Sequence, residues 1–302
     1  MSGKGSATNV MTSVNRKNSF LADFLELNLA VLFISTSGVL GKYIDIPVPT
    51  IIFLRAIMAS LVLYVYAKFK KFDFRIAKKD RLSLFIGGIF LAAHWITYFY
   101  SLKYSNVAVA MISLYTFPVM TAILEPIILK EKLQRVHLLL GLVILVGIYL
   151  IVPNFSLEDD YFFGVSLGLL SAFFYSIRNI LLKANGQSYN QSIVMLNQLG
   201  IMAIVLIPTL FSLDNSNIPN YLPEVALLAV LTTAIGHTLF VSSMKKFSIT
   251  SASLISSMQP VYGILLALII LGEYPKWNTI AGGLVIVSTV VIESLRVKKQ
   301  QK

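Results

Sequence analysis

Long apolar blocks separated by short polar segments run along almost the whole chain. Ten can be marked off, each near the roughly 20 residues that a helix needs to cross about 30 Å of hydrocarbon. The expected spans are 24–43, 50–68, 82–102, 105–129, 136–153, 162–182, 191–212, 223–243, 249–271 and 277–294. A helix of this length in a soluble protein carries a polar stripe, whereas residues 138–152, LLLGLVILVGIYLIV, carry none. The pattern predicts an all-α, polytopic membrane protein with ten transmembrane helices.

The composition agrees with a membrane protein. Of the 302 residues, 56% are hydrophobic and 13% are charged, against about half and a quarter in soluble domains. There is no cysteine, so neither disulfides nor thiol chemistry are expected. Residues 1–23 are polar and hold no apolar core of a cleavable signal, so we expect a disordered cytoplasmic tail before a retained first span. Residues 295–302 form a basic cytoplasmic tail in this scheme.

The net charge of +11 follows the predicted topology. With the N-terminus placed in the cytoplasm, 20 of the 25 lysines and arginines fall in inside segments. Outside loops hold Lys42, Lys103 and Lys276, while Arg55 and Arg178 lie within spans. Short basic loops resist translocation, so the bias predicts cytoplasmic termini. The expected location is the inner (plasma) membrane of a bacterium. No basic and aromatic stretch outside the spans is long enough for a nucleic-acid platform, so no nucleic-acid partner is expected.

The two halves of the chain resemble each other after a shift of 142 residues, which places Pro118 on Pro260. Residues 101–133 then lie over 243–275 without a gap, and the match includes Lys, Pro and Glu positions. GLVI also recurs, once from Gly141 and once 142 residues later. Because each unit holds five spans, an odd number, the second half must enter the membrane upside down. Inverted repeats are typical of secondary transporters, whose substrate lies between the halves near the midplane.

The repeated motifs also resemble a known family. They are SNVAVAMISLYTFPV, LKEKL and GLVILVGIYLI in the first half, and FSITSASLISSMQPV, LGEYP and GGLVIVS in the second. They are similar to the drug/metabolite transporter superfamily, in its ten-helix EamA-type branch, whose second helix Arg55 in TIIFLRAIMASLVL also fits. The resemblance implies two EamA-like repeats, 24–153 and 162–294. It further implies an efflux permease for a small organic metabolite or drug, with amino acids and related amphipathic compounds first among its substrates.

Prolines lie near the centres of spans four and nine. Proline lacks an N–H and its ring displaces the carbonyl four residues earlier, so Pro118 should free the carbonyl of Leu114 and Pro260 that of Ser256. A free carbonyl facing lipid costs several kcal/mol, so such breaks survive against protein or a watery cavity. Two interpretations stay open. The prolines are either gating kinks around a central binding cavity or packing kinks without ligand contact.

Polar and aromatic side chains at mid-membrane depth make up the predicted substrate site. They are His94, Trp95, Tyr98, Tyr115, Tyr175, Asn179, His237, Ser256 and Gln259. Aromatic rings would hold an apolar solute body, while Tyr115, Asn179 and Gln259 would fix its polar end. The aromatic cluster in span three also fits simple packing. Each histidine is either a buried neutral ring bonded to a carbonyl or a substrate or proton site, which leaves proton coupling open.

Other residues inside the spans have alternative uses. Arg55 can satisfy carbonyls or a neighbouring helix, or it can bind an anion, whereas Arg178 is near enough to the inner end of span six to snorkel. Gly164 and Gly168 form a GxxxG that allows close helix contact, within the bundle or between the subunits of a homodimer. The Glu-bearing exits of spans four and nine are expected to be structural.

Enzyme motifs are not found in the sequence. It has no phosphate-cradling glycine loop, HExxH or GxSxG, and with three histidines and no cysteine neither a metal site nor a cofactor is expected. The main alternative is a polytopic membrane enzyme acting on a lipid-linked substrate, which would need acidic or histidine clusters on one face. A scaffold or receptor fits poorly with polar groups at mid-depth in both halves. The expected partners are therefore a small-molecule substrate and the lipid bilayer.

Overall fold

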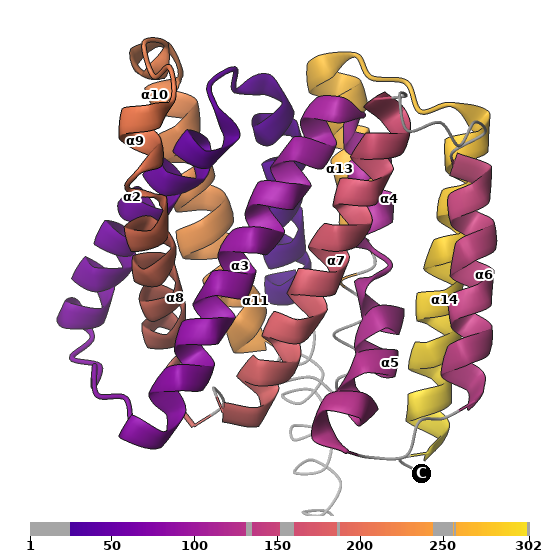
Figure 1. The fold of residues 1–302 in the computed structure, drawn as a ribbon, viewed down its shortest axis with the longest axis horizontal. Coiled ribbons are helices and arrows are strands. Elements are labelled where there is room, and N and C mark those ends of the chain that lie inside the picture. Colours follow the sequence, from indigo (N-terminus) through magenta and orange to yellow (C-terminus); the bar gives the residue numbers. More distant parts are fainter. Residues whose placement is uncertain are drawn as a thin grey trace, which may run out of the picture.

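The computed structural model describes residues 25–130, 135–151, 160–185, 188–243, 256 and 258–300. Every regular element among these residues is helical, as Figure 1 shows. The first helix is Leu25–Tyr43. It is followed by α2 (Val48–Phe69), α3 (Lys78–Tyr104), α4 (Val107–Leu114), α5 (Phe117–Leu129), α6 (Arg135–Ile151), α7 (Asp160–Asn185), α8 (Gln191–Leu206), α9 (Thr209–Ser212), α10 (Ile218–Leu227), η1 (Leu228–His237), α11 (Thr238–Ser243), α13 (Gln259–Leu271) and α14 (Trp277–Gln300). The all-α class is confirmed.

Seven described segments are long and apolar enough to cross a membrane. They are Leu25–Tyr43, Val48–Phe69, Lys78–Tyr104, Val107–Leu129, Asp160–Leu182, Gln191–Ser212 and Ile218–Phe240. Three further apolar helices are shorter, namely Arg135–Leu150, Gln259–Leu271 and Trp277–Ile292. The seven long segments make the chain a polytopic membrane protein. The shorter three fall within the remaining expected spans, and the count of ten membrane crossings stays a prediction.

Apolar side chains cover the outward faces of the helices. Leu61, Leu145, Ile204, Ile269 and Leu284 are 60–78% exposed although all are large and aliphatic. In water such a surface would be unfavourable, whereas lipid chains solvate it without cost. The outer surface is therefore built for a bilayer.

Polar side chains gather between the helices. Arg55, His94, Thr116 and Ser171 are all buried. A polar group at membrane depth is costly unless it faces the bundle interior or another polar group. These buried polar side chains are therefore expected to face one another in the interior of the helix bundle.

The packing brings distant parts of the sequence together. Helix α3 lies against α7 and α8, α2 lies against α8 and η1, and α13 packs on α4. Helices α6 and α14 lie side by side at one edge of the bundle (Figure 1). The largest buried cluster is centred on α3 and α4 and includes Trp95, Phe99 and Met111.

Two glycines let α7 approach α3 and α4 closely. A Cβ on Gly168 would lie 2.6 Å from the Cβ of Ser113, and one on Gly164 would lie 2.8 Å from the Cβ of Ser105. The hydroxyl of Ser101 donates to the carbonyl of Gly164 at 2.7 Å. Of the two uses open to this GxxxG, the structure shows packing within the bundle, so the motif gives no support to the predicted homodimer.

Local sequence explains where several helices begin and end. The side chain of Asn106 caps α4 by accepting from the N–H of Val109 at 2.9 Å, and Asn190 caps α8 in the same way. Glu273 adds a second partner to the start of α4, because its Oε2 accepts from the N–H of Val107 at 2.9 Å. The expectation that the exit of span nine is structural is thereby confirmed, while Glu131, its counterpart in span four, lies outside the described residues.

The ends of the first helix and α3 are joined by a pair of lysines. Lys42 donates its ammonium to the carbonyls of Leu102 and Ser105, both at 2.7 Å. In the opposite direction Lys103 donates to the carbonyl of Ile44 at 2.6 Å. Each lysine satisfies carbonyls at the end of the other helix. Two of the three basic residues in the expected outside loops thus have a structural use.

Span four is broken at its centre. Helix α4 ends at Leu114 and α5 begins at Phe117, so Pro118 is the second residue of α5, where its missing N–H costs nothing. Pro260 has the same position in α13, while residues 251–255 and 257 before it lie outside the described residues. The predicted break at Pro118 is confirmed. Gating at either proline stays a prediction.

Span eight departs from the expected single α-helix. Helix α10 passes into the ten-residue π-helix η1 and then into α11 without a loop. Hydrogen bonds in a π-helix join residues five apart, and such segments are rare and frequently found at functional sites. Periodic apolar positions do not distinguish this geometry from an α-helix, so a π-helix could not be predicted here.

Candidate substrate site

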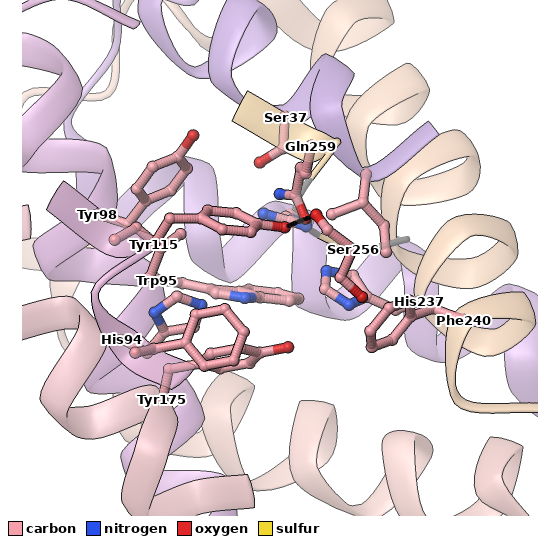
Figure 2. A pocket seen from close by; sticks show the side chains of 14 residues that line it. Ser37, His94, Trp95, Tyr98, Tyr115, Tyr175, His237, Phe240, Ser256 and Gln259 are labelled. Carbon is pink, nitrogen blue, oxygen red and sulfur yellow. Dashed lines mark hydrogen bonds between the residues drawn. The ribbon is translucent and has the colours of Figure 1, made fainter. Parts of the chain in front are cut away.

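A cavity lies at the level of the helix breaks (Figure 2). All predicted substrate residues except Asn179 line it, namely His94, Trp95, Tyr98, Tyr115, Tyr175, His237, Ser256 and Gln259. Six further lining residues were not in the predicted set, namely Ile34, Ser37, Arg55, Leu114, Phe117 and Phe240. These residues come from the first helix, α2 to α5, α7, η1, α11 and α13. Both halves of the sequence therefore build one shared space.

Aromatic rings form the walls of this cavity. The rings of His94 and Tyr175 stack with centroids 4.5 Å apart, and Phe117 meets Tyr175 edge-on at 4.8 Å. Trp95 lies 5.7 Å from His237, which comes from η1. Figure 2 shows the rings of Trp95, Tyr115 and Tyr175 in successive layers. Such walls suit the apolar body of a small molecule.

The hydroxyl of Tyr115 joins the break in span four to the start of α13 across the cavity. It donates to the backbone carbonyl of Ser256 and also lies 2.9 Å from Oε1 of Gln259 (Figure 2). The carbonyl of Ser256 is the one that Pro260 was expected to free. A tyrosine at the break in the first half thus satisfies the carbonyl four residues before Pro260 in the second.

His94 is held in one orientation by Ser171. The serine hydroxyl donates its single proton to the carbonyl of His94 at 2.9 Å and lies 2.7 Å from Nδ1 of the same residue. In the neutral tautomer whose Nδ1 donates to the serine oxygen, Nε2 is the acceptor. His94 therefore fits both interpretations of the sequence. It is a buried ring bonded to a neighbouring helix, and it also lines the cavity.

Arg55 lies at the cavity with few partners. It is 1% exposed, and its Nε donates to Oγ1 of Thr233 on η1 at 2.6 Å. Its guanidinium carbon lies 3.6 Å from the ring centroid of Trp95. The nitrogen Nη2 is buried without a hydrogen-bond partner, and so is the hydroxyl of Tyr98. Thr233 on the neighbouring helix thus accepts from Nε and leaves Nη2 of this arginine without a partner.

Arg178 has a different environment from the one expected. It was predicted to snorkel, but it is 6% exposed and its Nε and Nη2 donate to Oε1 of Gln198 at 3.2 and 2.7 Å. Its Nη1 donates to Oδ1 of Asn179 at 3.1 Å. The snorkelling prediction is wrong because an amide on α8 is close enough to hold the charge inside. Asn179 is engaged here and does not line the cavity.

No acidic residue is among the residues that line the cavity. Within the part of the chain that the structure describes, no group of three or more His, Asp or Glu is placed to hold a metal ion. The chemistry of the site therefore consists of aromatic faces, hydroxyls, imidazoles, one amide and one guanidinium. These groups can bind and orient a molecule.

The sequence profile of the EamA-like transporter family matches residues 25–152 and 162–295. The chain belongs to the EamA-like transporter family. The resemblance drawn from the repeated motifs is thereby confirmed. Members of this family are transporters and not enzymes, so this EamA-like chain is an integral membrane transporter, and the alternative of a membrane enzyme is set aside.

Individual relatives agree with the family. The pseudopaline exporter CntI of Pseudomonas aeruginosa (strain UCBPP-PA14) is 24% identical over 278 residues, which are 90% of this chain and 96% of that one. Human solute carrier family 35 member G1 is 26% identical over 290 residues, 90% of this chain and 78% of that one. A crystal structure of a protein that is 17% identical covers 93% of this chain and 99% of its own with a TM-score of 0.66. That last match shows the fold alone.

Proposed function

We propose that this EamA-like chain is a secondary transporter that moves a small organic metabolite or drug by alternating access, in the export direction. The observation that carries the proposal is the aromatic cavity, which both halves line at the level of the helix breaks. Apolar walls with a few convergent polar groups are the usual composition of a small-molecule site. Family resemblance puts amino acids and related amphipathic compounds first. An exporter among the relatives supports the outward direction.

Matching helix bounds support an inverted repeat. Phe117–Leu129 and Gln259–Leu271 are both 13 residues long and start 142 positions apart. Each begins with a proline at its second position and ends at a residue with positive φ, Lys130 at 58° and Gly272 at 66°. Helices α6 and α14 also begin 142 positions apart. We propose that the halves superpose by a pseudo-two-fold rotation about an axis in the membrane plane.

The pattern of helix contacts supports the same symmetry. Under the shift of 142 residues α2 corresponds to α8 and α6 to α14, and both pairs pack against each other. Likewise the contact of α3 with α8 corresponds to that of α2 with η1. Two helices that are related by a two-fold rotation contact each other where they lie next to the rotation axis. Two related halves around one site provide the two conformations that alternating access needs.

A transport assay tests the proposal. Purified protein reconstituted into vesicles should move a subset of amino acids or amphipathic metabolites across the bilayer and leave them chemically unchanged, as mass spectrometry of the recovered solute can verify. Vesicles without protein provide the control. Conversion of the solute, or equal leakage in both vesicle preparations for a broad metabolite panel, would contradict a transport function.

Proton coupling is part of the proposal. The imidazoles of His94 and His237 line the cavity, where a proton and a substrate can compete. If proton exchange drives export, then collapse of the pH gradient should abolish accumulation in inverted vesicles. Accumulation that continues unchanged after collapse would rule out this coupling while leaving transport itself intact.

A further inference from the structure

We infer that the transported molecule carries an oxyanion, specifically a single carboxylate, and that Arg55 binds it. The inference rests on the proposed role of the cavity as the substrate site. It narrows the substrate from small organic metabolites and drugs in general to organic acids with an apolar body. It also excludes organic cations as preferred substrates.

The first argument is the missing partner of Arg55. A charge at membrane depth costs at least about 2.5 kcal/mol and normally pairs with another group. A guanidinium has five N–H donors. One of them reaches Thr233, whereas Nη2 is buried with no acceptor, and no Asp or Glu lines the cavity. The charge is therefore left uncompensated by the residues that line this site.

The second argument is the orientation of the guanidinium. Trp95 covers one face of it, with 3.6 Å between the guanidinium carbon and the ring centroid. A cation–π contact stabilises the charge through its face and does not use the N–H groups, which lie in the plane. The in-plane edge is the part of arginine that binds carboxylates, often with two parallel hydrogen bonds. Stacking on Trp95 thus fixes a donor edge and leaves it free.

The third argument is the size of the charge. A buried donor without a partner costs about 1–3 kcal/mol, so the free Nη2 of Arg55 points to an absent acceptor. Tyr98 adds no second anchor, because its hydroxyl points away from Trp95 and Tyr115 (Figure 2) and lies 3.0 Å from the position that a Cβ on Gly38 would take. One buried guanidinium matches the single charge of a carboxylate better than the double charge of a phosphate monoester.

Arg178 shows that the fold can satisfy a buried arginine without an acid. Three of its nitrogens donate to amide oxygens of Gln198 and Asn179. No comparable amide meets Arg55. The oxygen of Gln259 lies on the cavity, 2.9 Å from the hydroxyl of Tyr115, and no hydrogen bond joins it to Arg55. A substrate ammonium would find no carboxylate on the cavity wall, which is why cations are excluded.

Tryptophan fluorescence can test the inference without transport. The chain has two tryptophans, and Trp277 is 82% exposed at the start of α14, so Trp277→Phe leaves Trp95 under Arg55 as the sole reporter. Hexanoate, hexanamide and hexylamine share one alkyl chain and differ in charge. In detergent, hexanoate should change the fluorescence saturably, and the amide and amine should bind at least about tenfold more weakly, a difference of about 1.4 kcal/mol.

Matched variants then locate the anchor in the same single-tryptophan background. Arg55→Gln should remove the preference for hexanoate over hexanamide, while Arg178→Gln should keep it. If Arg55→Gln does not fold, as its thermal melting would reveal, then the binding of the three probes to the Trp277→Phe protein still decides the question.

Several outcomes would overturn the inference. Equal binding of hexanoate and hexanamide, preferred binding of hexylamine, or no saturable change with any probe would each do so. Hexyl phosphate binding more tightly than hexanoate would overturn the assignment to a carboxylate. Because binding is measured here without vesicles, a failure of transport would contradict the proposed function and leave the acid preference standing as a separate result.

Discussion

At the scale of single residues, Trp95 is the centre of the candidate site. It is 2% exposed, contacts the guanidinium of Arg55 through its ring face and lies beside His237. It therefore links α2, α3 and η1 while its ring also lines the cavity. Few side chains in the described part of the chain combine a packing role and a binding role so directly.

We expect Trp95→Ala, Tyr98→Ala and Gln259→Ala each to weaken transport, with at least a tenfold loss for Trp95→Ala. The tryptophan change removes a cation–π contact worth up to about 2 kcal/mol and one wall of the site. Initial transport rates, corrected for the amount of protein in the membrane, provide the measurement. Leu139→Ala is the control because Leu139 is 62% exposed on α6, outside the cavity.

Wild-type kinetics in all three cavity variants, for several substrates, would mean that the substrate passes elsewhere. The prolines would then be packing kinks, the second interpretation of the sequence. A general loss of protein from the membrane in these variants, without loss in Leu139→Ala, would instead indicate a structural role of the aromatic cluster.

Most residues of the cavity could be predicted from the sequence because polar and aromatic groups are rare at membrane depth. Arg55 was recognised as a candidate for an anion site, but its stacking on Trp95 was not, since two helices must first be placed side by side. For the same reason Arg178 was misjudged. Its distance along the chain from the inner end suggested an escape to water, whereas Gln198 on α8 provides a nearer partner.

At the scale of helices, close packing at glycines holds the broken elements together. Helix α13 contacts α4 where Gly263 meets Met111, which is fully buried. A Cβ on Gly263 would lie 1.9 Å from the sulfur of Met111 and 2.4 Å from its terminal methyl carbon. The end of this flexible side chain must therefore shift within a close-packed interior to make room for the methyl group.

Gly263→Ala should therefore destabilise the protein, by about 1–3 kcal/mol as is typical of overpacking. Gly200→Ala in α8 is the matched control, because a Cβ there meets nothing within 4 Å. Alanine favours a helix by about 1 kcal/mol over glycine, so the control should be neutral or stabilising. Thermal unfolding of the detergent-purified variants measures both effects. A lower midpoint for Gly200→Ala than for Gly263→Ala would contradict this account of the α4–α13 contact.

The sequence located the helix breaks better than the helix types. Proline acts through its own missing N–H and ring, so Pro118 marks a break whatever surrounds it. The π-helix η1 depends on how carbonyls and amides pair along the backbone, and no residue type in Leu228–His237 specifies that pairing. The division of span four into α4 and α5 could thus be predicted, whereas the π-helical segment of span eight could not.

At the scale of the whole molecule, the apolar outer surface and the distribution of charge agree with a membrane orientation. Basic residues such as Lys70, Lys78 and Arg81 lie at the ends of α2 and α3 that connect these helices through residues 70–77. Lys42 and Lys103, at the opposite ends, are bonded to backbone carbonyls. The free positive charge of the described loops near α2 and α3 therefore lies on one side.

Reporter fusions after residue 75 and after residue 158 should report the cytoplasm and the outside respectively. The basic loop around residue 75 resists translocation, which is the basis of the expected topology. Each fusion carries its own check, because a reporter active inside and one active outside can be placed at the same position. The reverse pattern at both sites would contradict the orientation, and the same side at both would contradict the three expected spans between the two positions.

The π-helix η1 is wound more loosely than the α-helices on either side of it in span eight. Its hydrogen bonds join residues five apart, and each can be exchanged for a bond between residues four apart without loss of a partner. Such an exchange tightens the coil and turns everything that follows around the helix axis, while the preceding residues keep their places. Thr233 and His237 lie on this stretch, so tightening would draw the hydroxyl away from Arg55 and the imidazole away from Trp95. The hydrogen bond between Thr233 and Arg55 and the contact between His237 and Trp95 therefore depend on how this one helix is wound.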